Sequence, residues 1–417
     1  MKSNWSGNVV FGATGFHEPV TVEELQHIVS RSEQVRVVGA GHSFNDLVDT
    51  DGALVSLRRL NRVVEMDAAA STVTIEAGIL YHELADHLQR AGLALHNVPS
   101  LPDFSVVGAC ATGTHGSGDS NRCLAAAIRG MEIVTAGGDL VEIPADDLAA
   151  TAIGLGAFGV VARLTLEVEP AYAMAQELHL DMPQVNAIDH LDEIMASAYS
   201  VSYFTDWQHG RVEQVWRKFR LDTVTGPLPD TPDDYLGARR AEQRLAPSGP
   251  KWADLFTEQL LVPGPWHERL PHVRASRPVT SGRELQTEYF VARRHGPDAL
   301  RALVEFGPSL TPVMFGGVMS EVRSVAADDL WLSPCPDDSL ALHFSWVTDW
   351  PAVQQVLPEI EAALRPFEPR PHWGKLHALP PETVRRLYPR FDDFVVRAGH
   401  YDPLGKFRNR HLDQLFG

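Results

Sequence analysis

The sequence predicts an α+β chain organised in two lobes. Its 417 residues are enough for two units that each bury a core. Up to about residue 170, short β-rich runs alternate with helical patterns, which is typical of an α+β lobe. From residue 171 to about 370, longer strands of alternating apolar and polar residues are separated by helices.

Composition and charge limit the possible partners. Apolar residues make up 44% of the chain and charged residues 22%, as in an ordinary globular protein. With 36 basic and 54 acidic residues, the net charge of −18 disfavours nucleic acids and anionic membranes, because both require basic patches. The charge favours a neutral or locally steered substrate over a bulk anionic one.

The cysteines and the lengths of the apolar runs indicate the cellular compartment of the protein. Cys110, Cys123 and Cys335 are odd in number and lack C-x-x-C spacing, so we expect buried free thiols. The first residues show no signal-peptide core, and no apolar run approaches the roughly 18 residues of a membrane span. We therefore expect a cytoplasmic protein without a membrane segment, whose oligomeric state the sequence leaves open.

Local patterns predict the first elements in order. Thr21 and Glu24 have capping-box spacing, which predicts a helix over 21–33. A second amphipathic helix over 81–90 ends at Gly92. Short strands are expected at 35–41, 54–57, 63–66 and 73–77.

The first lobe is organised around the stretch V-R-V-V-G-A-G-H-S-F-N, from Val35 to Asn45. A strand that runs into a turn of small residues can cradle a phosphate with its backbone N–H groups. The dinucleotide fingerprint needs a third glycine where Phe44 stands, so this is not a Rossmann turn. The alternative interpretation is a tight turn with a solvated histidine, His42.

A second stretch rich in glycine, G-A-C-A-T-G-T-H-G-S-G, runs from Gly108 to Gly118. It is too rich in small residues for a core helix and too long for one turn, so we expect a loop. Loops of this length inside compact domains are usually functional, and this one suits a pyrophosphate; a flexible loop is the alternative.

The lobe closes with a hairpin and a strand. Strands over 132–135 and 140–143 flank a Gly137-Gly138 turn. The letters of Gly154–Gly159 match G-x-G-x-x-G, but a helical pattern precedes them and a strand over 160–168 follows. A dinucleotide turn needs the reverse order, so this match is rejected.

The pattern changes near Glu169-Pro170, where we place a domain boundary. The predicted domains are 1–170, 171–370 and a C-terminal segment, 371–417, that is rich in His, Lys, Arg and Asn. The middle domain is expected to contain strands at 203–207, 212–219, 318–325 and 340–347, helices at 298–306 and 352–364, and a surface loop over 226–253.

Polar residues on these strands are candidates for a site. Glu321 and Arg323 flank Val322 and share one strand face, where a solvated surface pair is the commoner arrangement. His343 and Ser345 share a face in the same way. Lys375 follows tryptophan and glycine in H-W-G-K, and partial desolvation would suit it to an electrostatic role.

Other catalytic patterns are missing from the sequence. The histidines do not fall in paired metal-ligand spacing, so no metal site is expected. There is no G-x-S-x-G elbow and no Walker A lysine either.

Taken together, the motifs resemble those of the vanillyl-alcohol oxidase superfamily of flavoproteins, in its alditol (xylitol) oxidase branch. The resemblance covers nearly the whole chain, and V-P-G-P-W-H-E-R-L-P-H (262–272) favours the branch. Six motifs occur in order: V-V-G-A-G-H-S-F-N (37–45), P-S-L (99–101), A-T-G-T-H-G-S-G (111–118), E-V-R (321–323), R-P-H-W-G-K (370–375) and D-P-L-G-K-F-R-N (402–409).

This resemblance implies an FAD-binding lobe, completed by the C-terminal segment, and a mixed-sheet substrate lobe. His42 matches the histidine that bonds covalently to the flavin ring. The residues implied for FAD binding are Val37, Val38, Gly39, Ala40, Gly41, His42, Ser43, Ser100, Ser105, Gly108, Thr112, Gly113, Thr114, His115 and Val160.

The implied reaction passes a hydride from a primary alcohol of a polyol to the flavin, which oxygen then reoxidises to give hydrogen peroxide. Lys375 and Arg323 would hold the substrate oxygen, and Glu321 would orient Arg323 and a hydroxyl. Ser100 and Ser345 would bind further hydroxyls. Ser345 stands where the family often has Thr, and Asp119 where an apolar residue is expected, which leaves the polyol preference open.

Two other functions stay open at this point. A sugar-lactone oxidase of the same superfamily shares the flavin turn and the H-W-G-K motif. A non-catalytic protein that binds a nucleotide through the glycine loops is an alternative from another class.

Overall fold

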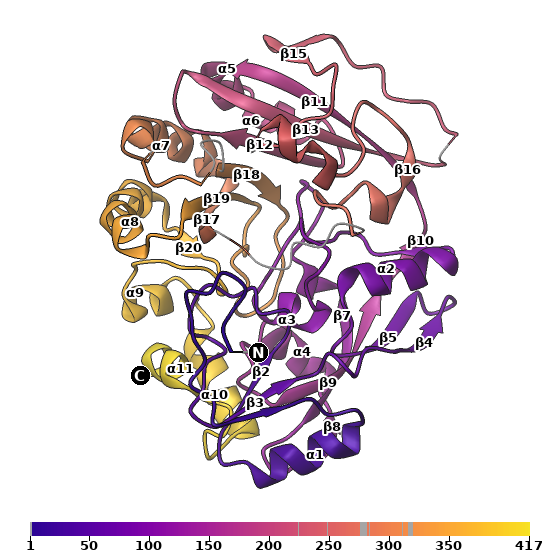
Figure 1. The fold of residues 1–417 in the computed structure, drawn as a ribbon, viewed down its shortest axis with the longest axis vertical. Coiled ribbons are helices and arrows are strands. Elements are labelled where there is room, and N and C mark those ends of the chain that lie inside the picture. Colours follow the sequence, from indigo (N-terminus) through magenta and orange to yellow (C-terminus); the bar gives the residue numbers. More distant parts are fainter. Residues whose placement is uncertain are drawn as a thin grey trace.

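The computed structural model describes residues 2–223, 225–247, 249–275, 282, 284–310, 312–315 and 320–417. Two groups of β-structure lie at opposite ends of the molecule (Figure 1). The first group contains two small sheets formed by residues before 168, and the second is one long sheet formed by residues after 172. The division at residue 170 stays a prediction, although the described strands change sheets there.

Helix α1 (Val22–Arg31) forms where its cap predicts it. The Thr21 side chain accepts a hydrogen bond from the Glu24 backbone N–H, and the Glu24 carboxylate accepts one from the Val20 N–H. These two bonds satisfy N–H groups that a helix start leaves free. The helix packs near a parallel sheet with the order β1-β3-β2: β1 (Gly15–His17), β2 (Val35–Val38) and β3 (Ala53–Ser56).

The second small sheet is antiparallel, with the order β4-β5-β9-β7-β8. Its apolar face packs on helix α2 (Tyr81–Arg90), which ends before Gly92 at φ +72°, and on α3 (Val106–Ala111). The bounds are β4 (Val63–Asp67), β5 (Thr72–Glu76), β7 (Ile128–Val134), β8 (Leu140–Glu142) and β9 (Val160–Glu167). Helix α4 (Leu148–Thr151) precedes β9. A separate antiparallel pair is formed by β6 (Leu93–Ala94) and β10 (Glu169–Pro170).

The long sheet has ten strands in the order β14-β15-β11-β13-β12-β18-β19-β17-β20, with β16 paired to β11. Every pair of these named strands is antiparallel, whereas the resemblance implies a mixed sheet. The bounds are β11 (Ala173–Pro183), β12 (Ser200–Thr205), β13 (Arg211–Leu221), β14 (Asp234–Tyr235), β15 (Ala238–Arg240), β16 (Gly264–Pro265), β17 (Glu284–Ala292), β18 (Ser320–Val325), β19 (Ser339–Val347) and β20 (Arg370–Pro371).

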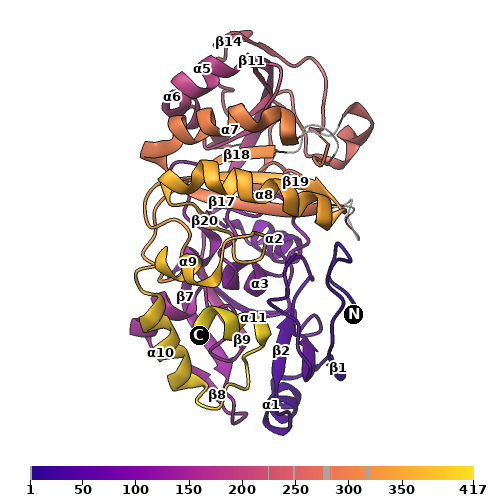
Figure 2. The ribbon, with the colours of Figure 1, turned by 90° about the vertical axis from the view of Figure 1, so that its left-hand side faces the viewer.

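Helices cover one face of this sheet, as Figure 2 shows for α7 and α8. Leu342, Phe344 and Trp346 of β19 belong to the apolar core on that face. The alternate residues of each strand therefore point to the opposite face, toward the first lobe. The helices are α5 (Gln184–Asp189), α6 (Leu191–Met195), α7 (Gly296–Leu310) and α8 (Trp350–Leu364).

The C-terminal segment lies against the first lobe. Its helices are α9 (Pro381–Arg386), α10 (Phe391–Tyr401) and α11 (Arg410–Phe416). The Val35 N–H donates to the Lys406 carbonyl, and the buried Arg36 guanidinium donates to the Phe407 carbonyl at 2.7 Å. The Asn409 amide donates to the carbonyls of Asp46, Leu47 and Asp49. The C-terminal segment is thus hydrogen-bonded to the start of the 35–45 stretch and to the residues that follow it.

Several predicted elements differ from the structure; for example, the strand predicted over 35–41 ends at Val38. The Gly108–Gly118 stretch is not loop throughout, because α3 includes Gly108 and extends to Ala111. The predicted strand 203–207 ends at Thr205, and part of the 318–325 strand lies outside the described residues. The 226–253 segment contains the short strands β14 and β15 rather than a simple loop.

Candidate active site

A cavity of about 1050 Å³ lies between the first lobe and the polar face of the long sheet. This volume is at the upper end of those found for small-molecule sites. Five parts of the chain supply most of its wall residues: the end of β2 and its turn, the segment 99–115, the segment 151–161, the strands β17, β18 and β19, and the turn 372–375. His82 and His272 also line the cavity.

The turn after β2 brings His42 to the cavity wall. Gly41 has φ +75°, a conformation that a side chain disfavours, and the imidazole of His42 follows it. The ring stacks on Trp5 with centroids 4.7 Å apart and meets Phe104 edge-on at 4.5 Å. Burial lowers the pKa of His42 to about 4, with Asp103 opposing the shift. The imidazole is therefore neutral near pH 7 and able to act as a nucleophile.

Close packing joins this turn to α3. A Cβ atom on Gly39 would lie 2.1 Å from Ser105 Oγ, and one on Gly108 would lie 2.6 Å from the same atom. Both positions therefore require glycine as long as Ser105 keeps its place. The wall includes both glycines and Ser105, followed by Thr112, Thr114 and His115.

Most residues expected at the cofactor site line the cavity, and two do not. Val37 through Ser43, Ser100, Ser105, Gly108, Thr112, Thr114 and His115 all belong to the wall. Gly113 instead faces Pro334, Ile153 and Trp373. Val160 lies in the core of the first lobe, and its neighbours Gly159 and Val161 line the cavity in its place.

Strand register places the polar side chains of the sheet in rows. Glu288 of β17 pairs with His343 of β19, which in turn pairs with Glu321 of β18. Because residues directly opposite one another share a face, these three side chains point to the cavity together. Ser345, two residues after His343, lies in the next row.

The cavity wall is centred on the buried carboxylate of Glu288. Its Oε2 lies 2.8 Å from Lys375 Nζ, and its Oε1 lies 3.3 Å from an Arg323 nitrogen and 3.2 Å from His115 Nε2. Burial alone would raise the pKa of Glu288, but these charges hold it well below its usual range. Glu288 thus stays ionised and anchors two cations at the wall.

Lys375 contacts two groups that fix its position. Its Nζ lies 2.8 Å from His343 Nδ1 as well as from Glu288, and His343 Nε2 lies 3.2 Å from Ser345 Oγ. Burial lowers the pKa of Lys375, with Glu288 opposing the shift. Burial also lowers the pKa of His343 to about 3, and the Lys375 charge acts in the same direction.

Arg323 and Glu321 are buried, so they do not form the solvated surface pair that strand statistics favour. An Arg323 nitrogen donates to Ser100 Oγ at 3.1 Å, and Arg323 Nε lies 3.6 Å from Glu321 Oε1. That carboxylate oxygen also meets His272 Nε2 at 2.7 Å. Burial alone would raise the pKa of Glu321, but the charge of Arg323 and the contact with His272 lower it.

Sequence reasoning missed Glu288 and His272. The sequence does contain a signal for Glu288, because polar residues alternate with apolar ones in E-L-Q-T-E-Y-F (284–290). The polar residues Glu284, Gln286 and Glu288 all line the cavity. His272 follows an irregular segment, 266–271, and has no periodic neighbours, so only tertiary structure reveals its place.

The two residues that depart from the family pattern lie in different places. Ser345 is a buried part of the cavity wall. Asp119 is an exposed residue that pairs with Arg293 at 3.0 Å and is not among the wall residues. Any effect of Asp119 on the substrate would be indirect.

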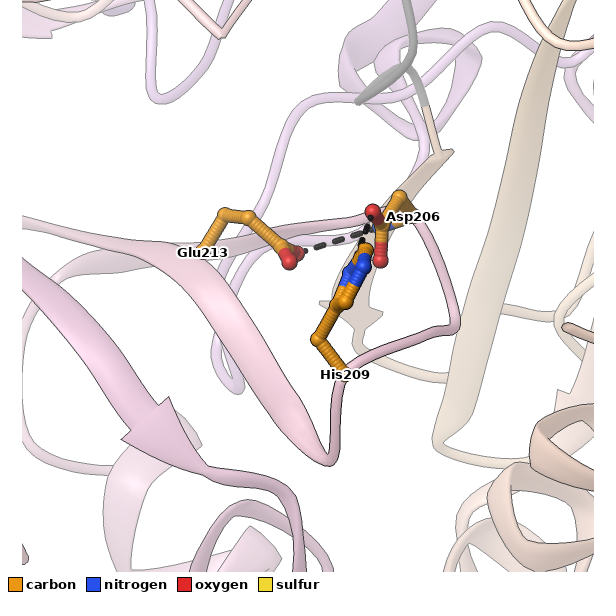
Figure 3. A group of neighbouring side chains, drawn as sticks. All are labelled: Asp206, His209 and Glu213. Carbon is orange, nitrogen blue, oxygen red and sulfur yellow. Dashed lines mark hydrogen bonds and ion pairs between the residues drawn. The ribbon is translucent and has the colours of Figure 1, made fainter. Parts of the chain in front are cut away.

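A further set of potential metal ligands lies outside the cavity, on the hairpin between β12 and β13. The side chains of Asp206, His209 and Glu213 point toward one another (Figure 3). Asp206 accepts from His209 Nδ1 at 3.2 Å, and Glu213 accepts from the Asp206 N–H at 3.1 Å. Burial and the Asp206 charge raise the pKa of Glu213 to about 7. A proton and these bonds account for the group without an ion.

Two further features bear on the environment of the chain. Cys110, Cys123 and Cys335 are buried free thiols, as the sequence predicts. Within the described ranges, no helix combines the length and the apolar character needed to cross a lipid bilayer.

Comparison with known proteins gives the geometry a context. The chain matches the FAD binding domain family over residues 13–144 and the D-arabinono-1,4-lactone oxidase family over residues 281–415. It is 44% identical to an alditol oxidase of a Streptomyces species, over 99% of this chain and 98% of that one. It is 29% identical to the L-gulonolactone oxidase of Scyliorhinus torazame, over 99% and 97% of the two chains.

Solved structures share the fold at low identity. A cholesterol oxidase of B. sterolicum matches with a TM-score of 0.78 at 16% identity, over 100% of this chain and 96% of that one. The glucooligosaccharide oxidase of Acremonium strictum matches with a TM-score of 0.73 at 15% identity, over 98% and 93%. The vanillyl-alcohol-oxidase-type fold is thus confirmed, and a non-catalytic nucleotide-binding protein is no longer supported. The chain belongs to the family of FAD-dependent oxidases that includes alditol oxidase and, as more distant members, the sugar-lactone oxidases.

Proposed function

We propose that this enzyme oxidises a primary alcohol of an alditol, of the xylitol or sorbitol type, to the aldose. The overall reaction converts one alcohol and one O2 to one aldehyde and one H2O2. The observation that carries the proposal is a set of polar side chains on the cavity wall: Glu321, Arg323 and Ser345 from the long sheet, and Lys375 from the turn 372–375. A neutral polyol offers no charge, so a row of hydrogen-bonding groups is what its recognition requires.

The residues of the first lobe fit FAD. The closely packed turn and α3 leave a continuous wall of small residues on one side of the cavity, where a larger side chain at Gly39 or Gly108 would collide with Ser105. Bound FAD supplies the acceptor for the hydride and, once reduced, the reaction with O2. We assign its binding to 37–43, Ser100, Ser105, Gly108, Thr112, Thr114 and His115, and to the backbone around Val160.

We further propose a covalent link between His42 and the flavin. Support comes from the neutral imidazole at the cavity wall, held between Trp5 and Phe104. The glucooligosaccharide oxidase of the same fold is described with a histidyl-linked FAD, a property of that protein.

Lys375 and Arg323 are the groups that would stabilise the substrate oxygen as the alcohol loses its proton and hydride. Both are cations with restricted motion, because Glu288 contacts each of them. Cations fixed in advance cost little reorganisation when negative charge forms on the oxygen. Lys375 faces the cavity from the C-terminal segment and Arg323 from the sheet, so the two approach that oxygen from different elements.

The remaining polar groups would bind the other hydroxyls. Ser100 carries a hydroxyl that Arg323 already contacts at 3.1 Å, and Ser345 carries one near His343. Glu321 can accept from a substrate hydroxyl while it orients Arg323. Each unmade bond to a buried polar group would penalise an alcohol that lacks the matching hydroxyl.

A sugar-1,4-lactone oxidase is the second candidate. The lactone oxidase family model covers residues 281–415, which include Glu288, Glu321, Arg323 and Lys375. The higher identity to alditol oxidase, 44% against 29%, favours the alditol.

A peroxide-coupled assay tests both candidates with purified protein supplied with FAD. Xylitol, sorbitol and L-gulono-1,4-lactone are compared at matched concentrations. We expect peroxide from the alditols and little from the lactone. Peroxide from the lactone alone would overturn the proposal in favour of the second candidate.

The other proposed partners are few. They are a small neutral polyol and O2, with no nucleic acid or membrane. We also propose the cytoplasm as the compartment, because three buried thiols stay unpaired most readily in a reducing environment.

A further inference from the structure

A fully buried lysine, Lys218 of β13, lies behind the substrate side of the cavity and is not part of its wall. Its Nζ donates to the Leu270 carbonyl at 2.5 Å, to the Pro271 carbonyl at 2.9 Å and to His272 Nδ1 at 3.1 Å. An ammonium group has three donor hydrogens and no acceptor. All three hydrogens are therefore used, and one of them reaches a histidine.

The other ring nitrogen of this histidine meets the proposed substrate site. His272 Nε2 lies 2.7 Å from Glu321 Oε1, and both residues line the cavity. The ring is held edge-on by Trp216 at 5.2 Å and by Phe204 at 5.7 Å between centroids. The chain of contacts from Lys218 through His272 to Glu321 is thus rigid and buried over its whole length.

The donor properties of Lys218 determine the tautomer of His272. Because the ammonium can only donate, Nδ1 must accept, and the neutral ring then carries its hydrogen on Nε2. If the ring instead took the lysine proton, both nitrogens would carry hydrogen. Either arrangement presents an N–H to the Glu321 carboxylate.

The charge state of the pair agrees with this assignment below about pH 7. Burial lowers the pKa of His272 to about 4, and the charge of Lys218 acts in the same direction, so the ring is neutral between these two values. Burial lowers the pKa of Lys218 to about 7, and Glu321 opposes this shift, so the ammonium form that can only donate prevails below that pH.

We propose that Lys218 and His272 are positioning residues that hold Glu321 in the orientation that receives a substrate hydroxyl. His272 and Arg323 both engage Glu321 Oε1, and no hydrogen bond to Oε2 is present among the residues that the structure describes. The second oxygen therefore remains for the substrate. The inference rests on the proposed role of Glu321 in binding a polyol.

Without Lys218 the ring is free to adopt the other tautomer. A hydrogen on Nδ1 would be available to one of the two carbonyls left behind, and Nε2 would then present a lone pair to Glu321 Oε1. Two acceptors at hydrogen-bond distance repel, so the carboxylate would turn away. If Lys218 only filled space, its replacement would leave the tautomer of His272 and the orientation of Glu321 unchanged.

The first test reads the tautomer directly, without substrate. Nitrogen chemical shifts of histidine-labelled holoenzyme separate protonated from unprotonated ring nitrogens, and the His272 signals are those lost in His272→Gln. We expect a protonated Nε2 and an unprotonated Nδ1 in the wild type, and exchange or reversal of the two in Lys218→Met. An unchanged pattern in Lys218→Met would overturn the inference.

The second test separates position from fold through paired variants. In His272→Gln the side-chain amide can still donate to Glu321, whereas in His272→Phe it cannot. We expect His272→Phe and Lys218→Met to lower kcat/KM for xylitol about tenfold to a hundredfold, mainly through KM, as the loss of a hydrogen bond to a charged group typically does. His272→Gln should stay close to the wild type.

Gln176→Met serves as the matched control. Gln176 pairs with Lys218 across the β11–β13 ladder, is equally buried and has a side-chain amide without a hydrogen-bond partner in the described part of the chain. It should leave KM unchanged, and equal effects of Gln176→Met and Lys218→Met would contradict the inference. A wild type that oxidises no polyol refutes the proposed function alone, because the nitrogen shifts still decide the tautomer.

Discussion

The Nζ atom of Lys375 lies 2.8 Å from the Glu288 carboxylate of β17 and 2.8 Å from the His343 imidazole of the neighbouring strand β19. Its backbone reaches this place through a short turn in which the Lys375 N–H donates to the His372 carbonyl. A long, flexible side chain is thereby held in one position. This arrangement permits a residue-scale prediction about the chemical step.

Lys375→Met should keep fold and flavin while it slows flavin reduction by xylitol. The ammonium interaction strengthens as charge forms on the substrate oxygen, so its loss falls on the chemical step, by about 10²–10³-fold. Rapid mixing under anaerobic conditions measures that step by the decay of the flavin absorbance. Reduction at the wild-type rate would mean that Lys375 has no part in the transition state.

His42→Ala should leave the flavin bound without a covalent link. The neutral imidazole that we propose as the attachment point would be gone, while the rest of the cavity wall stays. Acid-denatured, washed wild-type protein should stay yellow, and the variant should release its colour to the supernatant. His82→Ala, which removes another histidine of the same wall, is the control and should stay yellow. Colourless washed wild type would refute the covalent link.

At the scale of elements, the turn after β2 and helix α3 depend on each other through one oxygen atom. Ser105 Oγ occupies the space that a Cβ on Gly39 would need. Two segments about 65 positions apart thus pack closely at this point of the cavity wall.

Gly39→Ala should lower flavin content and thermal stability, because its Cβ would lie 2.1 Å from Ser105 Oγ. Ser105→Ala removes that oxygen and leaves the Ser105 Cβ 3.2 Å from the new methyl group, a tight but tolerable contact. The double variant should therefore recover much of the lost thermal stability, and a double-mutant cycle on the melting temperature measures the coupling. Strictly additive effects would show that the two sites are independent.

The accuracy of sequence prediction varied between elements for physical reasons. Helices α1 and α2 were predicted within two residues, because a cap, an apolar stripe and a terminal glycine are local signals. Helix α3 was missed, because V-V-G-A-C-A has low helix propensity and forms its helix through tertiary contacts. The alternation of residues in β17 could have predicted that Glu288 faces the cavity, whereas no periodic pattern indicates the position of His272.

At the scale of the whole molecule, the resemblance supplied what local patterns could not. The return of the C-terminal segment depends on contacts such as Asn409 with three carbonyls near residue 47, which no periodicity encodes. Strand order in the long sheet is equally non-local. The resemblance implied a mixed sheet, whereas the named strands of the long sheet all pair antiparallel.

Stability should fall as the pH drops from about 6.5 toward 4. The pKa values of His42, His272 and His377 are lowered to about 4 by burial, so these rings stay neutral in the folded state while they take protons in the unfolded one. The unfolded state then binds more protons, and the free energy of unfolding decreases with falling pH. Glu213, with a pKa raised to about 7, acts in the opposite sense, and so do Glu284, Glu361, Asp328 and His82, whose pKa values are also raised. The histidines whose pKa values are lowered by burial are more numerous and determine the direction.

Thermal unfolding at pH 7, 6 and 5 checks this expectation. His377→Gln, which is outside the cavity wall, should show a shallower decline than the wild type. A melting temperature that stays constant down to pH 5 would contradict the assignment of neutral buried histidines.

The contacts of Arg36 with Phe407 and of Val35 with Lys406 have a consequence for biosynthesis. They join positions that are 371 residues apart in both cases. A nascent chain on the ribosome therefore displays β2 and its turn long before the segment that supports them exists. Assembly of the cavity has to wait for synthesis to pass residue 409, and until then the partly made polypeptide exposes an unsupported β-edge to chaperones and proteases.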